Sequence, residues 1–198
     1  MVTKVIFVAI VAAVIIQRLF ELRLSKRHAA QLLAQGGREH GSNSLWLVKV
    51  LQVSWLVGMI AEVWCLDRPF IPALAMIAFL TTIAGQSFRY LSMRSLRQRW
   101  TLPIITIPGV PVVDSGIYRY LRHPNWLGVI LEIAAVPLIH TAYLTAIFCS
   151  VANAFLMVKR IQSEEQALSE DNNYAYVFAE HPRFIPRSGL MKVVNSQK

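Results

Sequence analysis

The sequence has few charged residues and almost no cysteine. Only 16% of its 198 residues are Asp, Glu, Lys or Arg, against roughly a quarter in a soluble domain. The two cysteines, Cys65 and Cys149, stand in or beside apolar runs, which argues against a disulfide framework and favours inert, buried thiols. No C-x-x-C or H-E-x-x-H spacing occurs, so we expect no metal site. A Rossmann glycine fingerprint and a P-loop are missing too, which argues against both nucleotide-binding folds.

Long apolar runs take the place of charge. Hydrophobic residues make up 55% of the chain, and the mean hydropathy is +0.46. The excess is concentrated in runs, which indicates a polytopic integral membrane protein. The first run, residues 5–16, is followed by no A-x-A-like cleavage site. We therefore interpret it as a retained span and not as a signal peptide.

The lengths of these runs predict about five transmembrane helices, because one crossing takes roughly 20 apolar residues. The run 125–158 is too long for one crossing and is interrupted by Pro137 and His140, so it predicts a helical hairpin. The expected spans are residues 4–24, 45–65, 70–90, 125–139 and 141–160. The expected fold class is therefore all-α, as a single membrane-embedded domain over residues 1–198. Residues 1–90 supply three N-terminal spans, and residues 91–185 supply the cofactor-binding and catalytic part.

Two connectors are predicted from their composition. Residues 25–44 are polar and contain Gly36, Gly37 and Gly41, which are typical of a helix end and a turn. Residues 101–115 contain three prolines, so helix is not expected there. Within them, residues 101–113 are predicted to form an extended or hairpin-like flap over a site.

The positive charge is unevenly distributed along the chain. Residues 17–49, 89–122 and 159–198 each hold six of the 20 Lys and Arg residues, which leaves only Lys4 and Arg68. With five crossings, the three basic segments share one face, and the positive-inside rule puts that face in the cytoplasm and the N-terminus outside. This distribution accounts for the net charge of +9, so we expect membrane lipids as partners and no nucleic acid.

Residues 116–128, with the sequence GIYRYLRHPNWLG, form the densest group of polar and aromatic side chains. Pro124 predicts that a helix begins there and that His123 is extended. The free N–H groups and positive dipole of such a helix start can hold a carboxylate or another anion at the membrane surface.

A second polar group, Arg160 with Glu164 and Glu165, follows the last predicted span on the same cytoplasmic side. Paired carboxylates can accept hydrogen bonds from an amino group or from ribose hydroxyls. A zwitterionic amino acid joined to a sugar fits between these carboxylates and the helix start at Pro124. S-adenosylmethionine is such a molecule, although the residues alone do not single it out.

Glu132 is a carboxyl group within a predicted span, about 12 Å deeper than Pro124. Such residues face a cavity or a partner, because a charge in lipid is costly. Two interpretations stay open: an acid, base or hydrogen-bond donor toward a substrate, or an internal pair between helices. The same choice applies to Arg18 and Glu21, which are spaced to pair with each other or to reach a polar site.

These motifs resemble the isoprenylcysteine carboxyl methyltransferase family of membrane methyltransferases over about residues 85–180. The matching pattern is Gly116-x-Tyr118-x-x-x-Arg122-His123-Pro124-Asn125-Trp126-x-Gly128, an apolar hairpin, and Arg160-x-x-x-Glu164-Glu165. Trp126 stands where the family usually has tyrosine. The N-terminal half, together with Glu132, is more loosely similar to bacterial enzymes that O-methylate alkylpyrones and alkylresorcinols. Its pattern is Arg18-x-x-Glu21-x-x-x-Ser25 and Gly36-Gly37-x-Glu39-x-Gly41.

The resemblance implies S-adenosyl-L-methionine as cofactor, a cytoplasmic site, and a lipophilic small-molecule acceptor that enters from the bilayer. The reaction would be in-line transfer of a methyl group to a carboxylate, phenol or enol oxygen. The implied catalytic residues are Arg160, Glu132 and Arg89. The implied cofactor-binding residues are Tyr118, Arg122, His123, Pro124, Asn125, Trp126, Gly128, Glu164 and Glu165.

Three alternatives stay open at this point. An NADPH-dependent sterol or steroid reductase would carry a similar Arg-His-Pro-Asn-aromatic-x-Gly run. A phospholipid N-methyltransferase would differ in its amine product. A small membrane scaffold or transporter is the non-enzyme alternative, although the internal repeats typical of transporters are not found in the sequence. The oligomeric state is left open.

Overall fold

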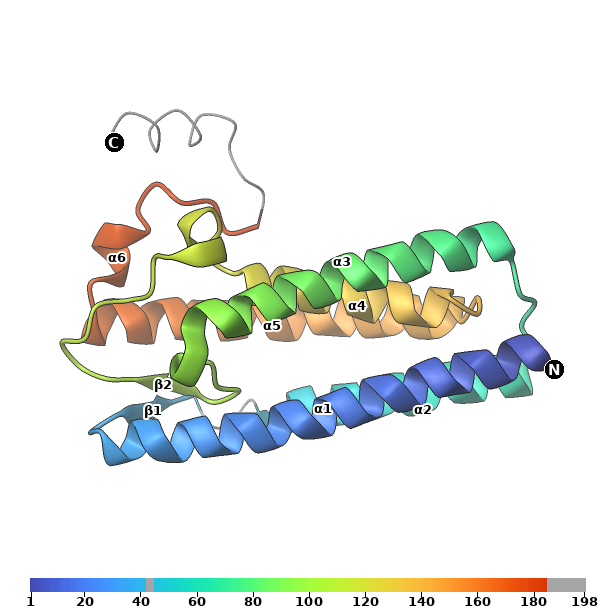
Figure 1. Cartoon of the computed structure of the whole chain (residues 1–198), viewed down its shortest axis with the longest axis horizontal. Helices are drawn as coiled ribbons and strands as arrows, with labels where there is room; N and C mark the ends of the chain where they lie inside the picture. The colour runs from blue at the N-terminus through green and yellow to red at the C-terminus, as the bar shows by residue number, and fades with distance from the viewer. Residues whose placement is uncertain (42–44, 185–198) are drawn as a thin grey trace.

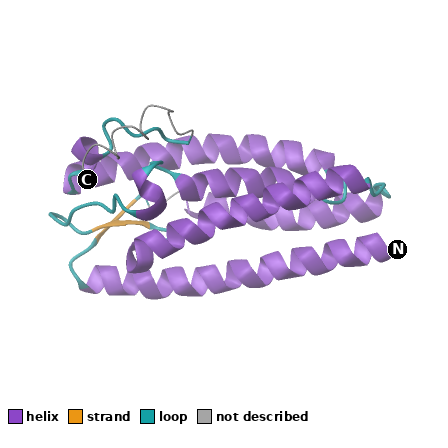
Figure 2. Cartoon of the chain, turned by 45° about the horizontal axis from the view of Figure 1, so that its top comes forward, coloured by secondary structure: helices purple, strands orange, loops and turns teal. Residues whose placement is uncertain are grey.

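The computed structural model describes residues 1–41 and 45–184, and these are largely helical (Figures 1 and 2). The helices are α1 (Val2–Ala34), α2 (Leu45–Cys65), α3 (Pro72–Leu96), α4 (Pro124–Leu138), α5 (Tyr143–Asp171) and α6 (Tyr174–Val177). Short 3-10 turns cover Arg97–Arg99 and Gly116–Arg119, and two strands, β1 (Arg38–His40) and β2 (Ile104–Thr106), complete the elements.

The long helices run side by side in two layers (Figure 1). Helices α1 and α2 form one layer, and α3, α4 and α5 form the other, with α2 packed against α5. The apolar core joins both layers through Phe7 of α1, Trp55 and Met59 of α2, and Val136 of α4. The Trp55 indole donates a hydrogen bond of 3.1 Å to the carbonyl of Ile133, so the core also has a fixed polar contact.

The expected hairpin of the last two apolar segments is confirmed by α4 and α5. Helix α4 begins at Pro124, as predicted, and His123 before it is non-helical with φ −130° and ψ 54°, which is outside the extended range expected before a proline. Helix α1 continues beyond residue 24, where the first span is expected to end, and stops at Ala34, just before the helix end predicted from Gly36 and Gly37. The glycine turn is confirmed, with positive φ at Gly36 and Gly41.

The protein is an integral membrane protein. Three of the described helices, α1, α2 and α5, are long and apolar enough to cross a membrane, and α4 is a shorter apolar helix of 15 residues. Helix α3 has 25 residues but does not meet the same measure of apolarity, since Gln86 and Arg89 fall within it. The count of five spans is therefore supported in part.

Residues 101–113 are not helical, as predicted, and contain the strand β2 and a turn at Gly109, but they do not form a hairpin with themselves. Strand β2 pairs antiparallel with β1 of the first connector, in the register Arg38 with Thr106. Asp171 at the end of α5 fastens this pair: its carboxylate accepts a hydrogen bond from the Thr106 hydroxyl and lies 3.1 Å from His40 Nε2. The two connectors and α5 are thus joined at one end of the molecule. These strands are the exception to an all-α fold.

Helices α3 and α4 approach each other so closely at Gly85 and Gly128 that there is no room for a side chain between their backbones. A Cβ atom on Gly128 would lie 2.6 Å from both the Gly85 carbonyl oxygen and Arg89 Cγ. Any side chain there would force the helices apart. Gly128, predicted as a cofactor-binding residue, therefore sits in a helix contact that fixes the position of α4.

Candidate active site

A cavity of ≈ 590 Å³ lies between the two helix layers at the end that carries β1 and β2. Residues 101–107 and 110–113 of the non-helical segment form part of its wall. One part of the cavity is polar and is built from α4, α5 and the segments beside them. The other is apolar and is built from α1 and α2.

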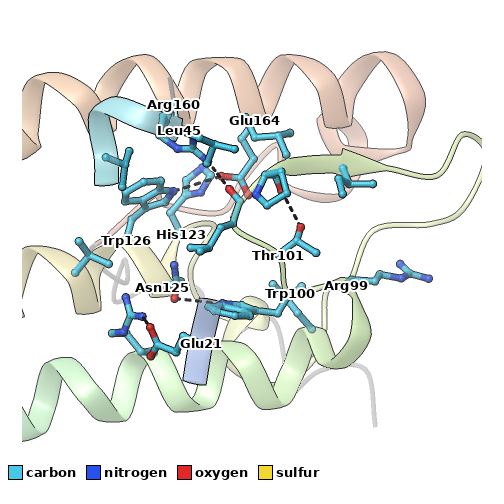
Figure 3. A pocket seen from close by; sticks show the side chains of 18 of the residues that line it. Glu21, Leu45, Arg99, Trp100, Thr101, His123, Asn125, Trp126, Arg160 and Glu164 are labelled. Atoms are coloured by element: carbon cyan, nitrogen blue, oxygen red, sulfur yellow. Dashed lines mark hydrogen bonds and ion pairs between the residues drawn. The ribbon is translucent and has the colours of Figure 1, made fainter. Parts of the chain in front are cut away.

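The central motif and the glutamate pair are in contact, as predicted, and Figure 3 shows His123, Trp126 and Glu164 in the polar part. His123 Nε2 lies 3.0 Å from Glu165 Oε1, and the Trp126 indole donates a hydrogen bond of 3.3 Å to Glu164 Oε2. These contacts join the start of α4 to α5, because Arg160 and the two glutamates lie on the extension of α5 beyond its apolar part. His123, Trp126 and Glu164 all line the cavity.

The two glutamates differ in their surroundings. Glu164 lines the cavity, whereas Glu165 is not among its lining residues. Arg183 donates two hydrogen bonds to the Glu165 carboxylate, of 3.0 and 2.6 Å, and the Tyr174 hydroxyl donates a third of 3.3 Å. Glu165 therefore ties His123 to the C-terminal segment, and Glu164 is the carboxylate that a ligand in the cavity would meet.

The C-terminal segment also occupies the backbone just before α4. The N–H groups of Arg122 and His123 donate to the carbonyls of Pro182 and Arg183, at 3.0 and 3.2 Å. The Arg122 side chain donates to the carbonyl of Ala179 at 3.1 Å. These donors are thus already used within the chain, which leaves the cavity-facing side chains as the main binding groups.

Two buried tyrosines of the polar part keep their protons. Burial, and next the negative charge of Glu164, raises the pKa of Tyr118 far above its usual range. Burial, followed by the charge of Glu165, likewise raises the pKa of Tyr174. Both hydroxyl groups are therefore neutral hydrogen-bond donors at any physiological pH.

Trp126 and Arg160 stand between the two parts of the cavity. The Arg160 guanidinium lies 5.8 Å from the centre of the Trp126 ring and donates a hydrogen bond of 2.6 Å to the Leu102 carbonyl. On the other side, Asn125 accepts a hydrogen bond of 3.5 Å from the Trp100 indole. A cation and two indoles therefore surround the passage from the polar part to the apolar part of the cavity (Figure 3).

The apolar part carries an excess of positive charge at its borders. Its walls include Leu19 and Leu22 of α1 and Val48 and Leu56 of α2. Arg18 and Arg89 are paired with Glu21 and Glu132. The other charged residues that line the whole cavity are the basic Lys49, Arg99, Arg122 and Arg160 and the acidic Glu164. An acceptor with an apolar chain and an acidic head group matches this lining.

A buried ion network closes the cavity toward α3. Glu132 is 0% exposed, and its Oε2 lies 2.6 Å from Arg18 Nη2 and 3.2 Å from Arg89 Nε. Both arginines also pair with Glu21, and Gln86 donates to the other oxygen of Glu132. Two cations and two carboxylates thus balance one another, and the internal pairing that was one interpretation of Glu132 is present.

The structure places the predicted site residues in two groups. Arg89, Tyr118, Arg122, His123, Asn125, Trp126, Arg160 and Glu164 line the cavity. Pro124, Gly128, Glu132 and Glu165 stand behind them: they start a helix, pack it, balance charge and hold His123. The catalytic role of Glu132 stays a prediction, and so do those of Arg89 and Arg160.

Comparison with known proteins agrees with this arrangement. The model of the isoprenylcysteine carboxyl methyltransferase (ICMT) family matches residues 76–170. The uncharacterized protein YpbQ of Bacillus subtilis is 32% identical over 165 residues, which cover 83% of this chain and 97% of that protein. The chain belongs to the ICMT family. Its match to the family model contains both the start of α4 and the glutamate pair, but not Tyr174 or Arg183.

Two further similarities were found for this ICMT family member. An uncharacterized protein of Haemophilus influenzae is 26% identical over 159 residues, which cover 80% of this chain and 92% of that protein. A solved structure of the eukaryotic intramembrane Ras methyltransferase ICMT matches with a TM-score of 0.47 and 20% identity. The match covers 62% of this chain and 46% of that chain.

Sequence reasoning missed several polar or aromatic residues of the cavity wall, among them Gln52, Trp100 and Asn153. Asn153 had a visible signal, because a single amide within a long apolar run usually faces a cavity or a partner. Trp100 follows a basic stretch and looks like an interfacial anchor. Its place beside Asn125 depends on a contact across 25 residues.

Proposed function

We propose that this protein is an S-adenosyl-L-methionine-dependent methyltransferase that methylates an oxygen of a lipophilic acceptor dissolved in the bilayer. One observation carries the proposal: a single cavity joins a polar part, with His123 and Glu164, to an apolar part between α1 and α2. Membership of the ICMT family supports the reaction class.

The donor set of the polar part fits this cofactor. Glu164 offers a carboxylate to a cationic amino group or to ribose hydroxyls, and Tyr118 and Trp126 offer aromatic faces to an adenine or a sulfonium. When bound, the cofactor supplies a methyl group on an already reactive sulfonium. Glu165 acts indirectly, because its carboxylate holds the His123 side chain in place.

The main task of the chain is to position the acceptor, since a reactive methyl donor needs little more than near-attack geometry. Arg160, at the passage, can hold the oxyanion of an acidic phenol, enol or carboxylate, and Arg89 and Arg99 are the other candidates.

We further propose that the chain crosses the membrane five times, with α3 and the short α4 as the additional spans. Of the 17 Lys and Arg residues in the described part of the chain, 15 then fall at the end that carries the cavity, which puts this end in the cytoplasm and the N-terminus outside. The looser similarity of Arg18, Glu21 and Glu132 to alkylpyrone and alkylresorcinol O-methyltransferases makes such compounds the first acceptors to test.

Methyl transfer by isolated membranes tests the proposal. Membranes that contain the protein, given methyl-labelled S-adenosylmethionine and lipid extract, should produce a labelled lipid that is an ether or ester. Glu164→Gln should abolish the product, because it removes the carboxylate that faces the cavity. Glu170→Gln, on the exposed surface of the same helix, is the matched control. A labelled amine, or transfer that survives Glu164→Gln, would contradict the proposal.

A further inference from the structure

Helix α2 presents an unpaired amide to the cavity. The α2 residues that line the cavity include Leu45, Val48, Lys49, Gln52 and Leu56, which share one helix face by their spacing. Gln52 lies about 10 Å from the start of this helix at Leu45, among apolar neighbours. Its Nε2 atom is buried and has no hydrogen-bond partner within the described part of the chain. A buried donor left in this state is costly and calls for a partner that comes from outside the chain.

A second amide lies on the facing helix. Asn153 of α5 lines the same cavity and is only 6% exposed. Its side chain makes no hydrogen bond with any residue that the structure describes. It stands two helical turns before Arg160, on the same face of α5. An amide at this place in an apolar membrane helix indicates a functional contact.

The packing of α2 against α5 puts these two amides at the same depth. Glu62 of α2 accepts hydrogen bonds from the backbone of Thr145, and a Cβ on Gly58 would lie 3.3 Å from the Thr145 side chain. The helices are antiparallel, so counting back along α2 and forward along α5 from these contacts places Gln52 opposite residues 151–155. Asn153 is at the centre of that range.

We propose that Gln52 and Asn153 form an amide pair that recognises a second oxygen of the acceptor, apart from the oxygen that takes the methyl group. This inference rests on the proposed function and narrows its substrate class. A plain alkyl chain at this depth would leave both amides unpaired, whereas a hydroxyl or carbonyl oxygen would pair with them. The acceptor is then an amphiphile whose head bears at least two oxygens.

Two probes that differ by one hydroxyl test this inference. One is a resorcinol and the other a phenol, each with the same saturated fifteen-carbon chain meta to the hydroxyl. Binding to the purified protein in micelles is followed by quenching of tryptophan fluorescence. Gln52→Leu and Asn153→Leu remove the amides at similar volume, and Val50→Leu, on the exposed surface of α2 outside the cavity wall, is the matched control. Thermal unfolding verifies that each variant is folded.

The wild-type protein and Val50→Leu should bind the resorcinol about tenfold more tightly than the phenol, as one additional hydrogen bond implies. Each leucine variant should reduce this preference to about twofold or less and should bind the phenol at least as tightly as the wild type does. That gain for the phenol would not follow from a merely structural role. If one leucine variant does not fold, the other variant and the preference of the wild-type protein for the resorcinol still test the inference.

Three results would overturn the inference: no preference in the wild type, a preference that persists in both leucine variants, or no binding of either probe. Methyl transfer is measured separately with labelled cofactor. A resorcinol preference that depends on the amides, without any methyl transfer, would refute the methyltransferase proposal and leave the amide pair in place.

Discussion

Removal of the charge on Glu132 should destabilise the protein without touching the cofactor-binding part. In Glu132→Gln the shape is kept, but Arg18 and Arg89 lose the carboxylate that lies 2.6 and 3.2 Å from them. The two guanidinium groups then share the single charge of Glu21. Breaking a buried pair on one side costs about 3–5 kcal/mol. The amide retains some hydrogen bonding, so we expect about 3 kcal/mol.

Thermal unfolding in detergent measures this loss. For a chain of this length, about 3 kcal/mol corresponds to a Tm that is about 6–12 °C lower. The double variant Arg18→Gln with Glu132→Gln removes one charge of each sign. Its Tm should therefore fall by less than the sum of the two single shifts. Glu170→Gln, on the exposed end of α5, should leave the Tm unchanged.

The same variants separate the two interpretations of Glu132. A structural role predicts a lower Tm together with cofactor binding close to that of the wild type once the protein is folded. An unchanged Tm with lost methyl transfer would refute this reasoning and would make Glu132 a catalytic group. Strictly additive Tm shifts in the double variant would also show that the two side chains do not act as a pair.

The remaining predictions concern packing and the segment 101–113. Gly128→Ala should cost about 1–3 kcal/mol, because its Cβ would meet the Gly85 carbonyl at 2.6 Å; an undiminished Tm would contradict the close helix crossing. Asp171→Asn removes the charged partner of Thr106 and His40. We expect this to weaken the attachment of the segment by about 1.4 kcal/mol. Protease cleavage within residues 101–113 should then be about tenfold faster, and an unchanged rate would show that other contacts hold the segment.

The hairpin and the start of α4 were predictable because local chemistry determines them. Pro124 fixes where the helix begins, and the break near His140 divides a run that is too long for one crossing. The end of α1 at Ala34 was predictable from Gly36 and Gly37, and residues 25–34 before it, although polar, contain good helix formers such as alanine and leucine. Polarity there indicates where the helix leaves the apolar layer, and not where it ends.

The wall of the cavity was only partly predictable because much of it depends on distant contacts. Strands of three residues carry no usable pattern, and His40 meets Thr106 across 66 residues. The two neighbouring glutamates look equivalent in the sequence. In the structure Arg183 donates hydrogen bonds to Glu165, and Glu164 is the one that faces the cavity. That distinction follows from the path of the C-terminal segment, which no local signal predicts.

Cofactor titration of the purified protein tests the central proposal most directly. Calorimetry in detergent should show saturable binding of S-adenosylmethionine and none of NADPH, which also separates the methyltransferase from a reductase. Glu164→Gln should weaken S-adenosylmethionine binding at least about tenfold, since one charge-assisted contact is lost, whereas Glu170→Gln should not change it. Saturable binding of NADPH, or cofactor affinity that is indifferent to Glu164, would contradict the proposal.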